Sequence, residues 1–407
     1  MKKHLLLQYI AGLLILASID GSLMAQSVAL PETLKEDSTH YKPSHQLGLD
    51  VRSGYVAPNH RFFEGENLSQ KHINQSLSVH LKYAFRFDKN STLGRMYPHA
   101  YQGIGVSYNT FFAASEMGNP VAVYAFQGSR IAQLSPRISL DYEWNFGASF
   151  GWKKYDEIDN PYNEVMGSDI NAYINLGFFL NWRLNPQWNL TAGLDFTHCS
   201  NGNTHHPNVG VNLIGGRIGV VRTLGKDEEA AGKRPHPLSV SPSISYDVVV
   251  YGTTRKRAFL DEHVAYVVPG SFGIIGLNFN PMYRFNNYFK VGVSLDVQYD
   301  ESANIKEYRV EGTTADNVKF HRPPFHKQFS TGLSLRGELV MPIFSVNAGI
   351  GHNLINSGED TKGFYQVLAL KTSLTRNLFL HVGYQLHDFK NPNNLMLGFG
   401  YRFHGKR

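Results

Sequence analysis

The sequence predicts an all-β protein, a transmembrane antiparallel β-barrel of about 12–16 strands. Three observations predict it. Apolar and polar residues alternate along several segments, no segment after the N-terminus is apolar enough for a membrane helix, and short connections alternate with long ones. The composition agrees, because 13% aromatic residues and 38 glycines suit strands in which apolar and polar positions alternate.

The first 25 residues are expected to be a secretory signal peptide. Lys2 and Lys3 precede an apolar stretch at 5–17, and small residues lead to a cleavage point after Ala25. The stretch is shorter than the roughly 20 apolar residues that a membrane-spanning helix needs. We therefore expect residues 26–45 to form a periplasmic segment and residues 46–407 to form one barrel in the outer membrane of a bacterium.

Charge and cysteine content limit the partners that we expect. The formal net charge is +6, but the basic residues are scattered, so no nucleic acid is expected, and the charge suits an anionic surface such as a phosphorylated glycolipid. Cys199 is the only cysteine, so the chain has no intramolecular disulfide.

The strands are predicted by an alternation with a period of two residues. It is clear in 172–183, 289–300 and 378–387, whose lengths match a tilted membrane strand. The last such segment, 394–403, is rich in aromatic residues on one face, as is typical of the final strand of outer-membrane barrels.

The connections between these segments set the expected topology. If both termini are periplasmic, the short turns are periplasmic and the long loops are external. Counting gives about 16 strands between 46 and 403, although 88–98 and 225–237 are long for periplasmic turns and leave 12 or 14 strands open. We expect no second domain. The short connections are 184–187, 286–287, 341–342 and 375–377, and the long ones are 56–75, 153–170, 253–270 and 301–324.

One segment, 195–212, carries residues suited to chemistry. His198 and Ser200 are two residues apart, so on a strand their side chains share one face, about 6.5 Å apart along the chain. A histidine so placed can take the proton of a serine hydroxyl and activate it as a nucleophile. The alternation puts both on the apolar, lipid-facing side with Phe196, and Asn212 of the next strand is in phase with Ile214. We expect the three polar side chains to meet on the outer wall near the external rim, where a lipid could reach them from the side.

The motif His198-x-Ser200-Asn201, followed by Pro207-Asn208-x-Gly210-x-Asn212, resembles the signature of the PagL-type lipid A 3-O-deacylases, also called acyloxyacyl hydrolases. The resemblance covers about 15 residues. It implies an outer-membrane serine esterase that removes an ester-linked acyl chain from lipid A, with lipopolysaccharide and outer-membrane lipids as its partners.

The resemblance also implies residue roles. Ser200 would be the nucleophile, His198 the general base, and Asn208 with backbone amides near Gly202 the oxyanion hole, with Asn201 and Gly210 as further positioning residues. The family typically has a glutamate twelve positions after the serine, where this sequence has Asn212. An asparagine can orient an imidazole but stabilises the imidazolium less. Known members are eight-stranded barrels, about half the size of this chain.

Several alternatives remain open. An acid from another loop, Asp156, Glu157 or Asp159, would replace Asn212 as the partner of His198. The pair His205-His206 lacks the spacing of metal ligands, so no metal and no cofactor is expected. The basic run 255–257 either binds lipid A phosphates or is an ordinary solvated run.

At the level of the whole protein, the first alternative to the esterase is a passive channel or transporter for small solutes. The second is a structural or adhesive barrel without activity. The sequence does not decide whether the chain forms a homodimer.

Overall fold

The computed structural model describes residues 42–225, 235–261, 264–310, 318–387 and 391–405. The expected signal peptide 1–25 lies outside these residues, as does most of the expected periplasmic segment 26–45. Within the described ranges, no helix is long and apolar enough to cross a membrane.

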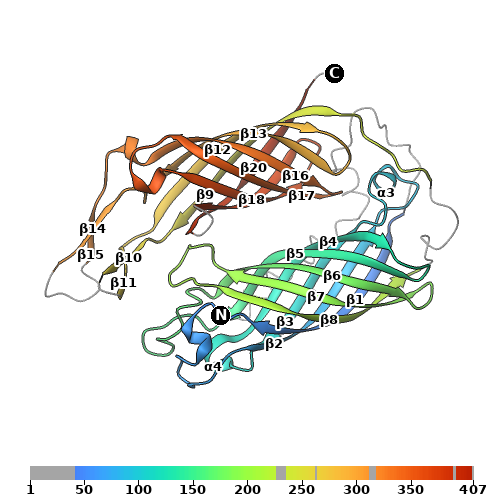
Figure 1. The fold of residues 1–407 in the computed structure, drawn as a ribbon, viewed down its shortest axis with the longest axis horizontal. Coiled ribbons are helices and arrows are strands. Elements are labelled where there is room, and N and C mark those ends of the chain that lie inside the picture. Colours follow the sequence, from blue (N-terminus) through green and yellow to red (C-terminus); the bar gives the residue numbers. More distant parts are fainter. Residues whose placement is uncertain (1–41, 226–234, 262–263, 311–317, 388–390, 406–407) are drawn as a thin grey trace.

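The expected all-β, antiparallel barrel architecture is confirmed, but its strands close into two barrels (Figure 1). The first barrel has eight strands: β1 (Ser44–Val56), β2 (Gln75–Arg86), β3 (Tyr101–Thr110), β4 (Gly118–Gln133), β5 (Ile138–Trp152), β6 (Ile170–Arg183), β7 (Trp188–Ser200) and β8 (Val211–Leu224). The second has eight as well: β9 (Ser243–Arg255), β12 (Phe272–Arg284), β13 (Phe289–Asp300), β16 (Phe329–Val340), β17 (Phe344–Ile355), β18 (Phe364–Ser373), β19 (Leu378–His387) and β20 (Asn391–His404).

The single barrel expected for 46–407 is therefore corrected to two. β8 pairs with β1 rather than with β9, and β9 closes the second barrel by pairing with β20. The connection 225–237, which is long for a periplasmic turn, joins the two barrels. The other long connection, 88–98, holds the short helix α3 (Thr92–Met96).

The remaining elements lie in the connections. Two hairpins, β10 (Ala258–Asp261) with β11 (Val264–Val267) and β14 (Lys306–Arg309) with β15 (Val318–His321), extend from the second barrel. Four further short helices are α4 (Ala114–Met117), η1 (Arg61–Glu64), η3 (Phe325–Lys327) and η4 (Glu359–Thr361). Apart from the connection with α3, the long loops of each barrel lie at one end, and Figure 1 shows these loop ends of both barrels at the same side of the molecule.

The outer walls of both barrels are apolar, and their interiors are polar. Leu176, Phe178 and Leu180 of β6 are exposed, as are Val291 and Val293 of β13, and these residues occupy alternate positions along each strand. Such continuous apolar surface would be a liability in water and suits lipid. Both barrels are thus transmembrane barrels.

The interior of the first barrel is filled by a neutral network of buried charges. Three cations meet three carboxylates there, and Asp50 alone lies 2.6 Å from Arg217 and 2.7 Å from Lys82. Eight-stranded barrels have interiors just wide enough for side chains to fill. The members of this network are Asp50, Arg52, Lys82, Glu143, Asp195 and Arg217.

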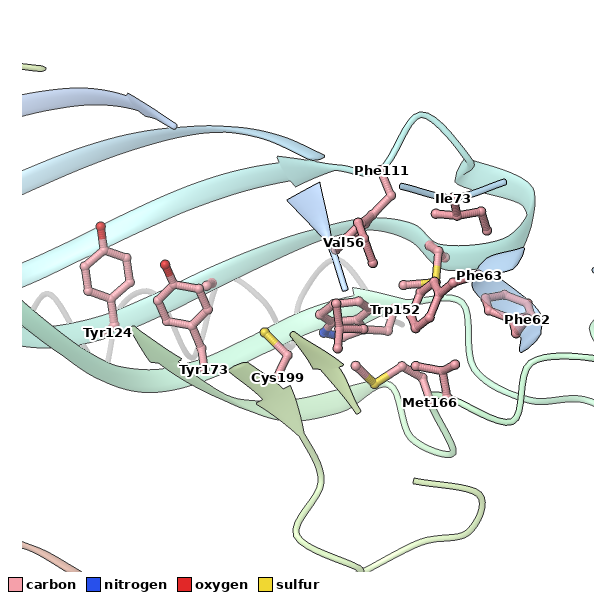
Figure 2. Close-up of a cluster of buried hydrophobic side chains, with 14 of the residues drawn as sticks. Val56, Phe62, Phe63, Ile73, Phe111, Tyr124, Trp152, Met166, Tyr173 and Cys199 are labelled. Carbon is pink, nitrogen blue, oxygen red and sulfur yellow. The ribbon is translucent and has the colours of Figure 1, made fainter. Parts of the chain in front are cut away.

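Buried apolar side chains close the loop end of the first barrel (Figure 2). Phe62 and Phe63 come from the loop after β1 and Met166 from the loop after β5, and they pack above wall residues such as Trp152. Cys199 belongs to the same cluster, so its side chain points inward, between the outward His198 and Ser200. The cluster ties the long loops together beside the segment that carries the chemistry.

The two barrels contact each other at the turn end. Leu93, Met96 and Tyr97 of the α3 segment pack with Val240 and Ile343, which come from the connection before β9 and the turn after β16. The Tyr97 hydroxyl donates to the Asn287 carbonyl at 3.0 Å. Between the walls, the rings of Trp144 and Phe344 meet edge to face, with centroids 5.2 Å apart.

Candidate active site

His198, Ser200 and Asn212 lie on the outer wall of the first barrel, at its loop end. β7 ends at Ser200, β8 begins at Val211, and His198 is directly opposite Asn212 in the ladder between them. The alternation along β7 sets the face, because Leu194 and Phe196 are 59% and 42% exposed whereas Asp195 and Cys199 are buried inside. His198, Ser200 and Asn212 are half-buried at the edge of this apolar wall.

These three side chains form one hydrogen-bonded chain. The Ser200 hydroxyl lies 2.9 Å from His198 Nε2, and His198 Nδ1 lies 2.8 Å from Asn212 Oδ1. Because Oδ1 can only accept, Nδ1 carries the proton and Nε2 is left free to accept from the serine. This is the tautomer that a general base for Ser200 requires.

The loop between β7 and β8 folds tightly next to Ser200. Gly202 and Asn203 adopt left-handed backbone angles, with φ of 64° and 63°. Asn208 fastens the loop, since its Oδ1 accepts from the Asn201 N–H at 2.9 Å and its Nδ2 donates to Asn203 Oδ1 at 3.1 Å. Both polar atoms of the Asn208 side chain are therefore already used within the loop.

Two donors beside Ser200 have no such partner. The N–H groups of Asn201, Thr204 and His205 donate within the loop, whereas that of Gly202 donates to no group in the described part of the chain. The Asn201 side-chain Nδ2 is also buried without a partner. An unsatisfied buried donor costs roughly 1–3 kcal/mol, so its presence next to a nucleophile points to a use for it.

Gly210 lets the backbone approach the histidine and the serine closely. Its φ is 78°, and a Cβ there would lie 3.2 Å from His198 Cε1 and 3.3 Å from Ser200 Cβ. Two other loops hold it in place: its N–H donates to the Val165 carbonyl at 3.1 Å, and its carbonyl accepts from Asn59 Nδ2 at 3.2 Å. Neither support is predictable from the sequence, because nothing local marks Asn59 or Val165 as neighbours of residue 210.

Asp156, one of the three acids considered as replacements for Asn212, has other contacts. Asp156 accepts from the backbone N–H groups of Ile158 and Asp159, and these bonds hold the pKa of its carboxyl below the usual range. In the described chain, Asn212 Oδ1 accepts the hydrogen bond from His198 Nδ1.

The basic run 255–257 is engaged in the second barrel rather than solvated. Arg255 pairs with Asp300 at 2.7 Å, and Arg257 pairs with Asp360 at 2.5 Å. Both guanidinium groups are therefore held by carboxylates. Among the described residues, no group of three potential ligand side chains converges as a metal site.

Comparison with known families gives two matches that together cover most of the chain. The model described as "Lipid A 3-O-deacylase (PagL)" matches residues 52–221, and the model described as "Acyloxyacyl hydrolase, C-terminal domain" matches residues 244–405. The boundary between the two matches falls between β8 and β9, where one barrel ends and the other begins. No curated protein matches the sequence.

Solved structures similar to the chain are distant. The siderophore receptor PirA from Pseudomonas aeruginosa is 8% identical, with 88% of this chain and 80% of that chain covered and a TM-score of 0.24. The FrpB iron transporter from Neisseria meningitidis is 13% identical, with 88% and 61% covered and a TM-score of 0.20. The CymD monoaromatic hydrocarbon channel is 8% identical, with 90% and 89% covered and a TM-score of 0.18. Scores this low transfer no function.

Proposed function

Because the chain belongs to the PagL family of lipid A 3-O-deacylases, we propose that it is a serine esterase that removes an ester-linked acyl chain from lipid A in the outer membrane. The observation that carries the proposal is the hydrogen-bonded chain Ser200–His198–Asn212 on a lipid-facing wall. Polar side chains at such a position are costly unless they are hydrogen-bonded, as these three are to one another.

The proposed reaction has two halves. In the first, Ser200 Oγ attacks the ester carbonyl while His198 Nε2 takes the hydroxyl proton, and the sugar oxygen leaves with that proton, so that the acyl chain is bound to Ser200. In the second, water gives a proton to His198 and attacks the acyl–Ser200 ester, the fatty acid is released, and His198 returns the proton to Ser200 Oγ. Asn212 holds the ring through Nδ1 in both halves.

The oxyanion of each half-reaction needs donors on the loop next to Ser200. The free N–H of Gly202 is the first candidate, and the Asn201 side-chain amide, buried without a partner, is the second. Asn208, for which the family resemblance implies a direct role, acts in this proposal by fixing the loop, because both its polar atoms are engaged. One oxyanion donor typically contributes about 10²–10³-fold to the rate.

The lipid would reach the site from the side. Phe196 and the neighbouring Ile174, which pairs with His198 in the ladder, are exposed and would contact acyl chains. The alternative function, a passive channel, needs an open barrel interior. The buried charge network and the apolar cluster at the loop end argue against one in the first barrel.

A mass spectrum of lipid A from cells with and without the protein tests the proposal. Wild type should remove one acyl chain, and Ser200→Ala should leave lipid A intact while the protein still assembles in the membrane. Ser168→Ala, which changes another serine at the loop end, is the control and should behave as wild type. Unmodified lipid A with wild-type protein would support the inactive barrel, and single-channel conductance in planar bilayers would support the channel.

A further inference from the structure

The loop beside Ser200 touches the outer wall of the second barrel. A Cβ on Gly202 would lie 3.2 Å from Tyr384 Cε2 and 3.7 Å from Leu395 Cδ1. Tyr384 on β19 and Leu395 on β20 are direct partners in the ladder, so their side chains form one surface. Gly202 is therefore placed against this surface, at a distance that leaves no room for a side chain without displacement.

A second contact lies at the other end of the same loop. The His206 ring forms a hydrogen bond with the backbone of Lys256, just after β9, and burial lowers the pKa of this ring. The adjacent Arg255 is fixed by its ion pair with Asp300. The second barrel thus contacts the loop at two points, at Gly202 in the left-handed turn and at His206 after it.

The contact is local. Tyr384 has two ladder neighbours on its face, Leu395 on β20 and Leu368 on β18. Tyr384 and Leu395 are half-buried, whereas Leu368 is 54% exposed. The covering thus stops between Tyr384 and Leu368, so it is confined to the side of Tyr384 that faces the loop.

The second barrel shows no site of its own at the corresponding strand. β19 ends in Gln385-Leu386-His387, and the residues that follow in the sequence are Asp388 and Phe389, so the His-x-Ser pair of β7 has no counterpart there. The second barrel therefore has another use than a duplicate reaction.

We propose that the second barrel positions the hydrolytic site of the first, with Tyr384 and Leu395 holding Gly202 so that its N–H is fixed toward the oxyanion. The inference rests on the proposed function of Ser200. Tyr384 is a positioning residue, because its ring contacts the loop and not the lipid ester. Fixing a donor in advance matters most in the transition state, where the oxyanion is formed.

The test is Tyr384→Ala in the full chain, with lipid A as substrate. Removing the ring leaves Gly202 free to move, and small displacements of a catalytic group can cost up to about a hundredfold in rate. We expect kcat to fall about tenfold with KM nearly unchanged, because the contact acts on the oxyanion and not on lipid binding. Tyr384→Phe should keep the wild-type kcat, since the ring edge and not the hydroxyl faces Gly202.

Leu368→Ala is the matched control, because Leu368 is the ladder partner of Tyr384 on the same face, whereas the atoms nearest a Cβ at Gly202 belong to Tyr384 and Leu395. It should leave kcat unchanged. Migration of unheated samples on gels shows that each variant has assembled. If an assembled Tyr384→Ala protein keeps the kcat of Leu368→Ala, the positioning role is refuted.

Hydrogen exchange of the amides in 201–208 measures the contact without any turnover. Exchange should be faster in Tyr384→Ala than in wild type or Leu368→Ala, and equal exchange would overturn the inference whatever the activity. The proposed function fails separately from this inference: it is refuted if wild type and Ser200→Ala give the same lipid A. Leu395→Ala provides a second, smaller perturbation of the same contact and should shift kcat and exchange in the same direction.

Discussion

Replacing Asn212 measures how much the orientation of His198 contributes. In Asn212→Ala, the hydrogen bond of 2.8 Å from His198 Nδ1 to Oδ1 is lost, and the ring can turn away from Ser200. In the ground state this is a bond between neutral groups, with a net contribution of roughly 0.5–1.5 kcal/mol. When His198 holds the serine proton, the donor is an imidazolium, and a bond to a charged group contributes roughly 1.5–3 kcal/mol.

The difference between these two states sets the expected effect. Because the free enzyme already contains the neutral bond, only the additional stabilisation in the transition state changes kcat and kcat/KM. The difference between the two ranges is about 1–1.5 kcal/mol, which corresponds to a fall of roughly 5–10-fold in kcat/KM. The assay is the release of fatty acid from purified lipid A in detergent, with the rate followed against substrate concentration and pH.

Two further substitutions at this position make the prediction sharper. Asn212→Leu keeps the size of the side chain and removes the acceptor, so it should be as slow as Asn212→Ala. Asn212→Glu introduces the carboxylate that is typical of the family, which favours the imidazolium, so it should be at least as active as wild type, with the acidic limb of the pH–rate profile moved to higher pH. Ile214→Ala, the next outward position on β8, is the control. Wild-type kcat/KM in both Asn212→Ala and Asn212→Leu would remove Asn212 from the mechanism.

Three other predictions follow from the same contacts. Gly210→Ala should lower activity at least tenfold while the barrel still assembles, because an alanine at φ 78° is strained by about 1–2 kcal/mol and its Cβ presses on His198 and Ser200; normal turnover would contradict this. Glu143→Ala should cost about 3–5 kcal/mol of unfolding free energy, because Lys82 and Arg217 lose a buried partner, and the urea midpoint on gels measures the loss. Acidification below about pH 6.5 should lower the protection of the amides in 201–208, taken as their exchange rate relative to the intrinsic rate at the same pH, because burial holds the pKa of His206 below its unfolded value, so the unfolded state binds more protons; His206→Gln should remove this dependence.

The sequence predicts the strands well because the local pattern is what the membrane requires. In 172–183 every second residue faces lipid in the structure, as the alternation predicts. The convergence of His198, Ser200 and Asn212 follows from the same period together with a tight connection between two paired strands. These contacts depend on residues within about fifteen positions, and a period of two residues fixes them.

The division into two barrels could not be predicted in this way. One barrel of sixteen strands and two barrels of eight have the same alternation, and nothing local to β8 indicates that Leu49 rather than a residue of β9 pairs with Val220. The signal that the sequence offers is the connection 225–237, whose length is unusual for a periplasmic turn. The contact of Gly202 with Tyr384 joins positions far apart in the chain, and neither residue type marks it.

The covalent link between the barrels changes how their contact depends on concentration. Two separate proteins in a membrane would meet according to their abundance, and a sparse population would be mostly unpaired. Here one chain carries both, so the local concentration of each barrel near the other stays constant, of the order that short tethers give, about millimolar. The specific activity should therefore stay the same when the protein is diluted many-fold in detergent. A cell that makes only a few copies would still have both barrels in contact in each of them.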